Sequence, residues 1–321
     1  MILGHNSQWE FLQKAVKANR LPHAFLFWGV KHLGKKTVAK EFVKFLNCED
    51  SQKSNKPCDN CRSCQDFQKE THPDLLVLAP ETKEIKIPQI RKLQHFLSFR
   101  PYSAKYKSVI IDEAAPMNQE AQSCLLKTLE EPTDSSILFL IAEHSEAFFS
   151  TILSRVQKIR FSSASQEEIR DYLKKKNVPL AKIEAISSFS FGRPGLSIRF
   201  SEDPAALELV NQRIKEISVI SRQPLFAQFQ YVSKMDLKKQ GQMESLEAWL
   251  RYFRDKLRIK IGLKPDFKNL PSAPNFSFPQ IKKIINSIER INYLISSTNI
   301  NQRLAIESIM LQFENDSPRN Y

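Results

Sequence analysis

Residues 24–42 read AFLFWGVKHLGKKTVAKEF, and they carry the clearest indication of the fold. It begins with a continuous apolar run typical of a buried strand, and its second half places apolar residues at helical spacing. The loop between them carries Gly29, Gly34 and Lys35 at the spacing of the G-x4-G-K-[ST] loop, whose backbone amides cradle phosphates. The stretch therefore predicts an α/β domain of the nucleotide-binding type.

The loop departs from that motif at the position that binds magnesium. The motif places a Ser or Thr hydroxyl directly after its lysine to hold Mg²⁺, but this position is Lys36. Thr37 follows one residue too late, and a frame that used it would put Val30 and Lys35 where the motif has glycines. We therefore expect a degenerate ATP site that binds Mg²⁺ weakly.

A second part of such a site follows the apolar stretch SVIID (108–112). Folds with this loop keep a Mg²⁺-binding Asp and a water-activating Glu at this place, and here the residues are Asp112 and Glu113. Taken alone, the pair could equally be a turn at the end of a strand. Together with the loop it indicates the remains of an ATP site. The expected residues of that site are Gly29, Gly34, Lys35, Thr37, Asp112 and Glu113.

Further apolar runs alternate with helical patterns up to residue 161. These runs are LLVLA (75–79), ILFLIA (137–142) and VQKIRF (156–161). Continuous apolar strands that alternate with helices predict a parallel sheet covered on both faces. We therefore expect residues 1–161 to form the nucleotide-binding-type domain.

Strand patterns are absent after residue 161, and helical patterns continue almost to the end of the chain. We expect a small helical lid domain at 162–205 and an all-α collar domain, which mediates oligomerisation, at 206–321. Two apolar stripes at helical spacing support the second of these, and the proline-punctuated segment 264–279 reads as a loop between helices. The stripes are Ile281, Ile284, Ile285, Ile288, Ile291 and Ile295, and then Leu304, Ile306, Ile309 and Met310.

Four of the five cysteines stand at the spacing of a metal site, Cys48-x9-Cys58-x2-Cys61-x2-Cys64. Cys-x2-Cys steps let two sulfurs reach one tetrahedral Zn²⁺, and four sulfurs leave no position open for water or substrate. The pattern therefore predicts a structural zinc module (48–64). Ordinary buried or redox cysteines and an iron–sulfur cluster are the alternatives.

The composition favours a soluble protein with an anionic partner. Lys and Arg exceed Asp and Glu by 48 − 35 = 13, which suits a polyanion such as nucleic acid. Because the lysines are spread along the chain, solvated helix faces explain the charge equally well. No apolar run reaches the roughly 18 residues that span a bilayer, and the first 20 residues lack the apolar core of a signal peptide. We expect a cytoplasmic protein without membrane contact.

Several motifs, in this order, resemble the clamp-loader branch of AAA+ proteins, and within it the delta-prime family of the bacterial DNA polymerase III clamp loader. The resemblance covers residues 1 to about 200 strongly and the C-terminal helices more weakly. The motifs, besides the four cysteines, are LPHAFLFWG, GKKTVAKEF, THPDL, VIIDEA, CLLKTLEEP, ILSR and NQRLAIESIMLQF.

The resemblance implies a role for Arg155. Ser154-Arg155 matches the family's Ser-Arg-Cys motif, although the third residue here is Val156. In the family this arginine acts in trans, as a finger on the ATP bound to the neighbouring subunit, and such fingers raise the rate about 10³- to 10⁵-fold. Without the resemblance, Arg155 would read as a surface arginine at the end of a helix.

The family's two sensor positions also differ in this sequence. The first sensor usually carries Thr or Asn, and this chain has Ala142-Glu143-His144. The second is an Arg or Lys, which Leu196 replaces unless Arg193 serves from nearby. Together with Lys36, these changes predict weak or absent ATP hydrolysis by this chain alone.

Three functions follow from these observations. The first is a non-hydrolysing subunit of the hetero-pentameric clamp loader, which helps to place the sliding clamp on primed DNA. Such a subunit contacts the clamp and the DNA through the complex. It is part of the polymerase holoenzyme, and has polymerase activity only through membership of that complex. The second is an ATP-hydrolysing motor subunit of the same loader; Lys35, Asp112 and Glu113 favour it, and the absence of a long tail opposes it. The third is a zinc-dependent nucleic-acid-binding module on a vestigial ATPase fold.

Overall fold

The computed structural model describes residues 2–50, 57–81, 84–235, 239–265, 276–297 and 300–313. The chain divides into two compact units. One unit contains residues 1–172 and 192–196, and the other contains residues 173–191 and 197–321. The first unit holds the sheet and the second is built from helices.

The first unit is built on a five-stranded sheet in which every pairing is parallel. The order of the strands is β2-β3-β4-β1-β5, so the strand before the phosphate-type loop lies between β4 and β5. This confirms the parallel sheet expected from the alternating pattern, with strand ends shifted by at most one residue. The strands are β1 (Ala24–Trp28), β2 (Leu75–Leu78), β3 (Lys107–Ile111), β4 (Ser136–Ala142) and β5 (Gln157–Arg160).

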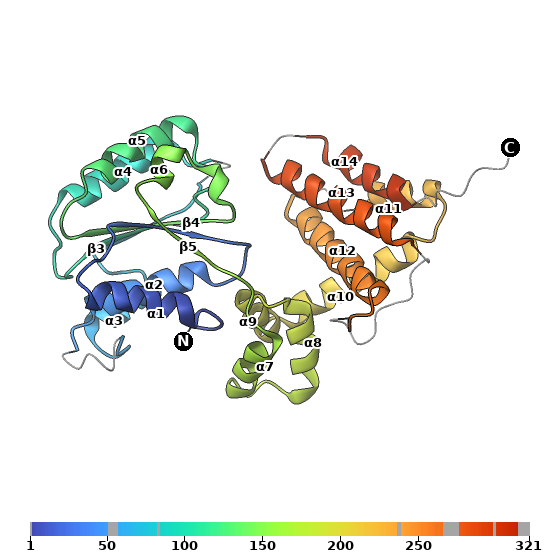
Figure 1. Ribbon diagram of the computed structural model, residues 1–321, viewed down its shortest axis with the longest axis horizontal. Coiled ribbons are helices and arrows are strands. Elements are labelled where there is room, and N and C mark those ends of the chain that lie inside the picture. Colours follow the sequence, from blue (N-terminus) through green and yellow to red (C-terminus); the bar gives the residue numbers. More distant parts are fainter. Residues whose placement is uncertain are drawn as a thin grey trace. The chain divides into compact units, whose positions relative to one another are not determined.

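Helices cover both faces of this sheet (Figure 1). Phenylalanines fill the core on the side of α1 and α2, where the rings of Phe25 and Phe139 stack with their centroids 5.4 Å apart. The opposite core joins α4, α5 and α6 to the sheet through aliphatic side chains. The helices are α1 (Asn6–Lys17), α2 (Lys35–Asn47), α3 (Arg62–Gln68), α4 (Ile87–Ser98), α5 (Gln119–Glu130) and α6 (Ser150–Leu153).

Because all strands run in parallel, their carboxyl ends meet at one edge of the sheet, where ligands bind in open α/β folds. The loop after β1, Asp112 after β3 and Glu143 after β4 follow three neighbouring strand ends at this edge. The sheet therefore brings together residues that are far apart in the sequence.

In the second unit, helices surround a core that contains Trp249, Tyr252 and Phe253. All six residues of the isoleucine stripe at 281–295 are buried, as predicted. In the stripe that follows, Leu304 is an exception: it is 62% exposed, because it lies on the outer side of its helix. Much of the predicted loop at 264–279 lies outside the described residues. The main helices are α8 (Leu180–Ser190), α10 (Pro204–Ile220), α11 (Leu225–Lys234), α12 (Lys239–Lys260), α13 (Phe278–Ser297) and α14 (Gln302–Met310).

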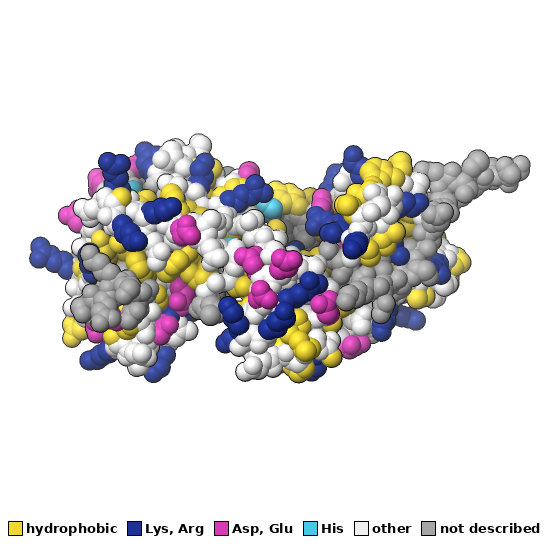
Figure 2. Space-filling view, turned by 60° about the horizontal axis from the view of Figure 1, so that its bottom comes forward, with side chains coloured by type: hydrophobic (Ala, Val, Ile, Leu, Met, Phe, Trp, Pro, Cys, Tyr) yellow, Lys and Arg dark blue, Asp and Glu magenta, His cyan; other side chains and the backbone are white. Residues whose placement is uncertain are grey.

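The chain passes between the two units at three points, two of which lie within α7 (Gln166–Lys175) and α9 (Pro194–Glu202). Figure 2 shows lysine and arginine side chains at several separate places on the visible face, as their spread along the sequence predicts. Among the residues that the structure describes, no helix is long and apolar enough to cross a membrane.

Candidate functional site

Two glycines shape the loop that joins β1 to α2. A Cβ atom on Gly29 would lie 2.4 Å from the carbonyl oxygen of Phe161, so a side chain does not fit there. Gly34 precedes the first turn of α2 with a φ of +86°, a left-handed conformation that glycine adopts without strain. The strand, loop and helix thus have the arrangement that the phosphate-binding motif requires.

Lys35 is buried, and its ammonium group bonds to the loop itself. Its Nζ donates to the carbonyl oxygens of Gly29, at 2.5 Å, and Val30, at 2.8 Å. Burial lowers the pKa of Lys35 to about 8, against the opposing influence of Glu143 and Asp112. The lysine that would reach a nucleotide's phosphates is therefore already supplied with hydrogen-bond acceptors.

Two further lysines of the loop region pair with the acidic residues at the strand ends. The Nζ of Lys36 lies 3.3 Å from Oδ2 of Asp112. The Nζ of Lys31 lies 3.4 Å from a carboxylate oxygen of Glu143 and 3.7 Å from one of Glu113. An ammonium group thus stands beside the carboxylate that would hold Mg²⁺, and like charges repel. The residues present do not fit a Mg²⁺ ion at Asp112.

The segment that was expected to carry the second sensor packs against the same loop. The backbone N–H of Gly195 donates to the carbonyl oxygen of His32 at 2.8 Å, and Leu196 is buried. Arg193 is close enough to Lys35 to lower its pKa through charge repulsion. A residue that precedes α1 also contacts this loop: Nε2 of His5 forms a hydrogen bond with the carbonyl oxygen of Leu33 at 2.6 Å. Thr37 is exposed on the first turn of α2.

The four cysteines of the predicted module lie together. Their Sγ atoms are all within 4.8 Å of one another, whereas tetrahedral Zn–S bonds of 2.3 Å would place sulfurs about 3.8 Å apart. If the distances between the Sγ atoms became slightly shorter, all four sulfurs could therefore bind one metal ion. Cys48 follows the end of α2, and Cys61 caps the start of α3, so two helix ends fix the cluster.

Backbone N–H groups donate hydrogen bonds to two of these sulfurs and so favour the thiolate form. The N–H of Cys61 donates to Sγ of Cys58 at 3.3 Å, and the N–H of Cys64 donates to Sγ of Cys61 at 3.4 Å. Such bonds favour the thiolate, and they lower the pKa of Cys58 to about 7, while burial raises the pKa of Cys48 and of Cys64. Thiolate is the form that binds metal, so the cluster can hold a metal ion.

A buried lysine attaches this module to α2. Lys44 is 3% exposed, and its Nζ lies 2.7 Å from carboxylate oxygens of both Glu41 and Asp59 and 3.0 Å from Oε1 of Gln68. Burial lowers the pKa of Lys44, but hydrogen bonds to Asp59 and Glu41 outweigh burial and raise it. The sequence pattern did not reveal this role, because a lysine on an amphipathic helix usually faces water.

Arg155 lies just after α6 and is held by its own chain. Its Nη2 is 3.0 Å from Oε1 of Glu130 at the end of α5, and its Nη1 donates to the carbonyl oxygen of Thr151 at 2.9 Å. The side chain keeps 37% of its surface exposed. An anchored, partly exposed guanidinium is suited to meeting a group outside this chain. Glu130 belongs to the CLLKTLEEP motif, but its contact with Arg155 is visible only in the structure.

A buried glutamine supports the segment that leads to Arg155. The Nε2 of Gln122 donates to the carbonyl oxygens of Met117, at 3.1 Å, and Ala147, at 3.0 Å, and its Oε1 accepts from the N–H of Phe149 at 2.9 Å. The sequence does not reveal this role, since a single Gln within a helical pattern carries no signal. The bonds to Ala147 and Phe149 connect α5 to the turn before α6, and the bond to Met117 holds the segment that leads into α5.

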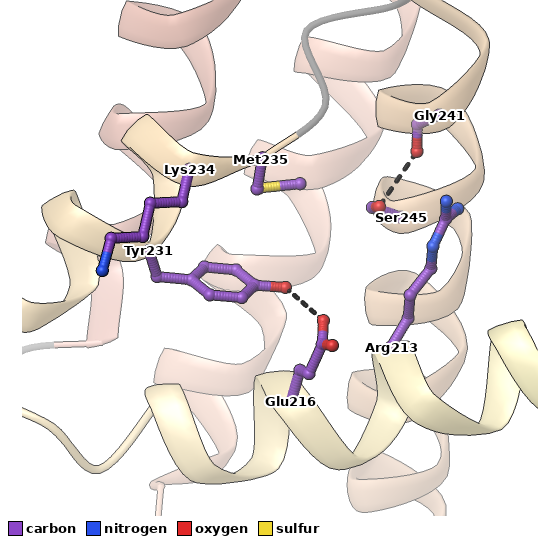
Figure 3. A pocket seen from close by; sticks show the side chains of 7 residues that line it. All are labelled: Arg213, Glu216, Tyr231, Lys234, Met235, Gly241 and Ser245. Carbon is purple, nitrogen blue, oxygen red and sulfur yellow. Dashed lines mark hydrogen bonds between the residues drawn. The ribbon is translucent and has the colours of Figure 1, made fainter.

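The second unit contains a pocket of about 240 Å³, shown in Figure 3. Its polar groups are largely paired with one another: the hydroxyl of Tyr231 donates to Glu216 at 2.8 Å, and Ser245 donates to the carbonyl oxygen of Gly241 at 2.9 Å. Burial and the adjacent Glu216 raise the pKa of Tyr231. Since few polar groups remain to recognise a ligand, we assign no function to this pocket. Its lining residues are Arg213, Glu216, Tyr231, Lys234, Met235, Gly241 and Ser245.

The sheet order, the glycine-containing loop at the end of β1 and the acidic pair after β3 define an ATPase-type α/β domain. A solved structure shares this fold: a DNA polymerase III gamma subunit-related protein from Thermotoga maritima superposes with a TM-score of 0.54 at 17% identity, covering 95% of this chain and 98% of that one. The chain therefore has the same fold as that protein, a parallel α/β domain followed by helices.

Sequence comparison narrows the class to a family. Residues 4–165 match the family described as DNA polymerase III, delta subunit. DNA polymerase III subunit delta' of Bacillus subtilis is 29% identical over 257 residues, which cover 79% of this chain and 77% of that protein. DNA polymerase III subunit tau of Bacillus subtilis is 30% identical over 168 residues, but these are 52% of this chain and only 30% of tau. The chain belongs to the delta-prime family of DNA polymerase III subunits.

Proposed function

We propose that this chain is a non-hydrolysing subunit of a DNA polymerase III clamp loader, which supplies Arg155 to the ATP site of a neighbouring subunit. The observation that carries this proposal is the pairing of Lys36 with Asp112 at 3.3 Å. This ion pair occupies the carboxylate that a P-loop ATPase needs for Mg²⁺. The guanidinium of Arg155, in contrast, remains anchored and partly exposed. The carboxylate that would bind Mg²⁺ at the chain's own site is thus occupied by an ammonium group, while the arginine that would serve a neighbouring site remains partly exposed.

Two further features support the absence of hydrolysis. Glu113, which stands at the water-activating position, is paired with Lys31, and the same lysine pairs with Glu143 at the first sensor position. Leu196 at the second sensor position is buried and has no charge to offer a γ-phosphate. Phosphoryl transfer is catalysed mainly by charged groups that are correctly positioned, and these changes leave few such groups available at this site.

In the same proposal, the four cysteines bind one structural Zn²⁺ ion. Thiolates at Cys-x2-Cys spacing suit zinc, and a site with four sulfur ligands has no open position for a substrate. The backbone N–H···S bonds at Cys58 and Cys61 support this choice of ligand state. The metal would hold the segment between α2 and α3, and take no part in chemistry.

The wider assembly is part of the proposal as well. We place the sheet domain at 1–161, a lid at 162–205 and a collar at 206–321, where the collar helices join other subunits into a hetero-pentamer. Clamp and primed DNA are then contacted through the complex, in the cytoplasm. The similarity to tau, together with the retention of Lys35, Asp112 and Glu113, favours an ATP-hydrolysing motor subunit as the second candidate.

Reconstitution tests the proposed membership. Mixed with the tau or gamma subunit, the delta subunit and the sliding clamp of the same organism, this chain is expected to enter a stable complex that loads the clamp onto primed DNA. The measurement is co-elution in gel filtration, followed by clamp retention on nicked circular DNA. Full loading by the mixture without this chain, or failure of the chain to join the complex, would contradict the proposal.

A further inference from the structure

Three lysines on one face of α2 connect the phosphate loop to the cysteine module, which we define as residues 48–50 and 57–70. Lys36, Lys40 and Lys44 are four residues apart, so they stack along one side of the helix. Lys44 pairs with Asp59 inside the module. The other two lysines meet Glu70, the last residue of the module.

Glu70 is positioned by the turn that ends α3. It has a φ of +58°, and its backbone N–H donates to the carbonyl oxygen of Phe67 at 3.2 Å. Its carboxylate forms an ion pair with Lys40 and lies 3.9 Å from Nζ of Lys36. The hydrogen bond from Lys40 lowers the pKa of Glu70, so the carboxylate stays charged near neutral pH. The module thus presents a fixed negative charge to the first turns of α2.

Lys36 lies between two carboxylates that come from different parts of the chain. Asp112 follows β3 and Glu70 ends the cysteine module, and both lie within ion-pair distance of the same ammonium group. The Lys36 side chain is 37% exposed and that of Asp112 is 25% exposed, so a cation from solvent could otherwise reach Asp112. In the described part of the chain, this ammonium group therefore lies beside the carboxylate at which a divalent cation would bind.

We propose that Lys36 determines the specificity of the phosphate loop: it excludes magnesium–nucleotide complexes by acting as a resident cation on Asp112, and Glu70 is the residue that positions it. The inference rests on the proposed function, because it names the cause of the lost ATP site. It also gives the cysteine module a second role, since the module carries the carboxylate that holds Lys36 in place.

The test is nucleotide binding by the full chain, with a fluorescent ADP analogue as the probe and Mg²⁺ either present or chelated. Lys36→Thr restores the hydroxyl of the motif, and we expect its affinity for the analogue with Mg²⁺ to rise about 10- to 100-fold, the usual effect of one metal-site residue. With Mg²⁺ chelated, no gain is expected. A rise in affinity is informative, because the loss of a positive charge would by itself weaken the binding of phosphates.

Lys40→Thr is the matched control. It removes an equal charge from the same helix and the same partner, Glu70, but Lys40 forms no ion pair with Asp112 among the described contacts. We expect no gain from it. The double variant Lys36→Thr/Asp112→Asn should lose the gain, and Glu70→Gln should show a smaller gain that also depends on Mg²⁺.

The inference is wrong if folded Lys36→Thr and Lys36→Ser proteins bind the analogue no better than wild type, or if their gain does not depend on Mg²⁺. Circular dichroism and thermal melting identify the folded variants. This failure differs from failure of the proposed function, which would show itself as tight MgATP binding and turnover by the wild-type chain.

Discussion

Replacing Arg155 with alanine is expected to lower ATP hydrolysis at the neighbouring subunit's site by about 10³-fold or more, the range measured for arginine fingers. The guanidinium would stabilise the charge that develops on the transferred γ-phosphate, and alanine offers no substitute. In a reconstituted loader, the measurement is the ATPase rate stimulated by clamp and primed DNA. Clamp loading should fall with it.

Two variants make this result specific to the finger. Arg20→Ala removes an exposed arginine from the same unit and should leave the ATPase rate unchanged. Glu130→Gln keeps Arg155 but removes its carboxylate partner at 3.0 Å, so an intermediate rate is expected from the less well-anchored guanidinium. If Arg155→Ala assembles normally and both the ATPase rate and clamp loading are unchanged, the finger assignment is wrong.

The second large effect concerns the metal. Protein purified without chelators is expected to contain one zinc ion per chain, and its removal should unfold the cysteine module, because structural Zn²⁺ contributes about 10–16 kcal/mol of binding free energy at pH 7 in zinc-finger peptides. Elemental analysis measures the zinc. Hydrogen exchange over residues 57–70 measures the unfolding, which should also loosen the contact of Lys44 with Asp59.

Cysteine variants separate this site from the remaining thiol. Cys61→Ser should abolish zinc binding, whereas Cys124→Ser makes the same change outside the cluster, next to Gln94, and should leave the zinc content unchanged. Purified protein without zinc would overturn the assignment. A visible absorption band with bound iron would do so too, in favour of an iron–sulfur cluster.

The sequence predicted the sheet well because its strands are continuous apolar runs that only a doubly covered parallel sheet can bury. It also predicted the position of the loop between β1 and α2, in which Gly29 has no room for a side chain and Gly34 has a positive φ. That this loop is of the phosphate-binding kind stays a prediction. Proximity of the four cysteines followed from their spacing, and the zinc ion that the same spacing predicts stays a prediction.

The ion pairs of the site could not be predicted, because they join residues that are distant in the sequence. Nothing in the spacing places Glu70 near Lys36, or Glu130 near Arg155; these contacts arise when α3 packs on α2 and when α6 packs on α5. For the same reason the sequence showed that Lys36 removes a hydroxyl, but not that its ammonium pairs with Asp112. Helical periodicity alone likewise placed the exposed Leu304 on a buried stripe.

We infer that this chain is part of an ATP-driven clamp loader but does not hydrolyse ATP itself. Steady-state MgATP binding and turnover by the isolated wild-type chain tests it most directly, with Lys35→Ala as the background for contaminating ATPases. We expect no saturable binding at micromolar concentrations, and a turnover rate equal to that of Lys35→Ala. Micromolar affinity with steady turnover that Lys35→Ala abolishes would contradict it and identify an ATP-hydrolysing motor subunit.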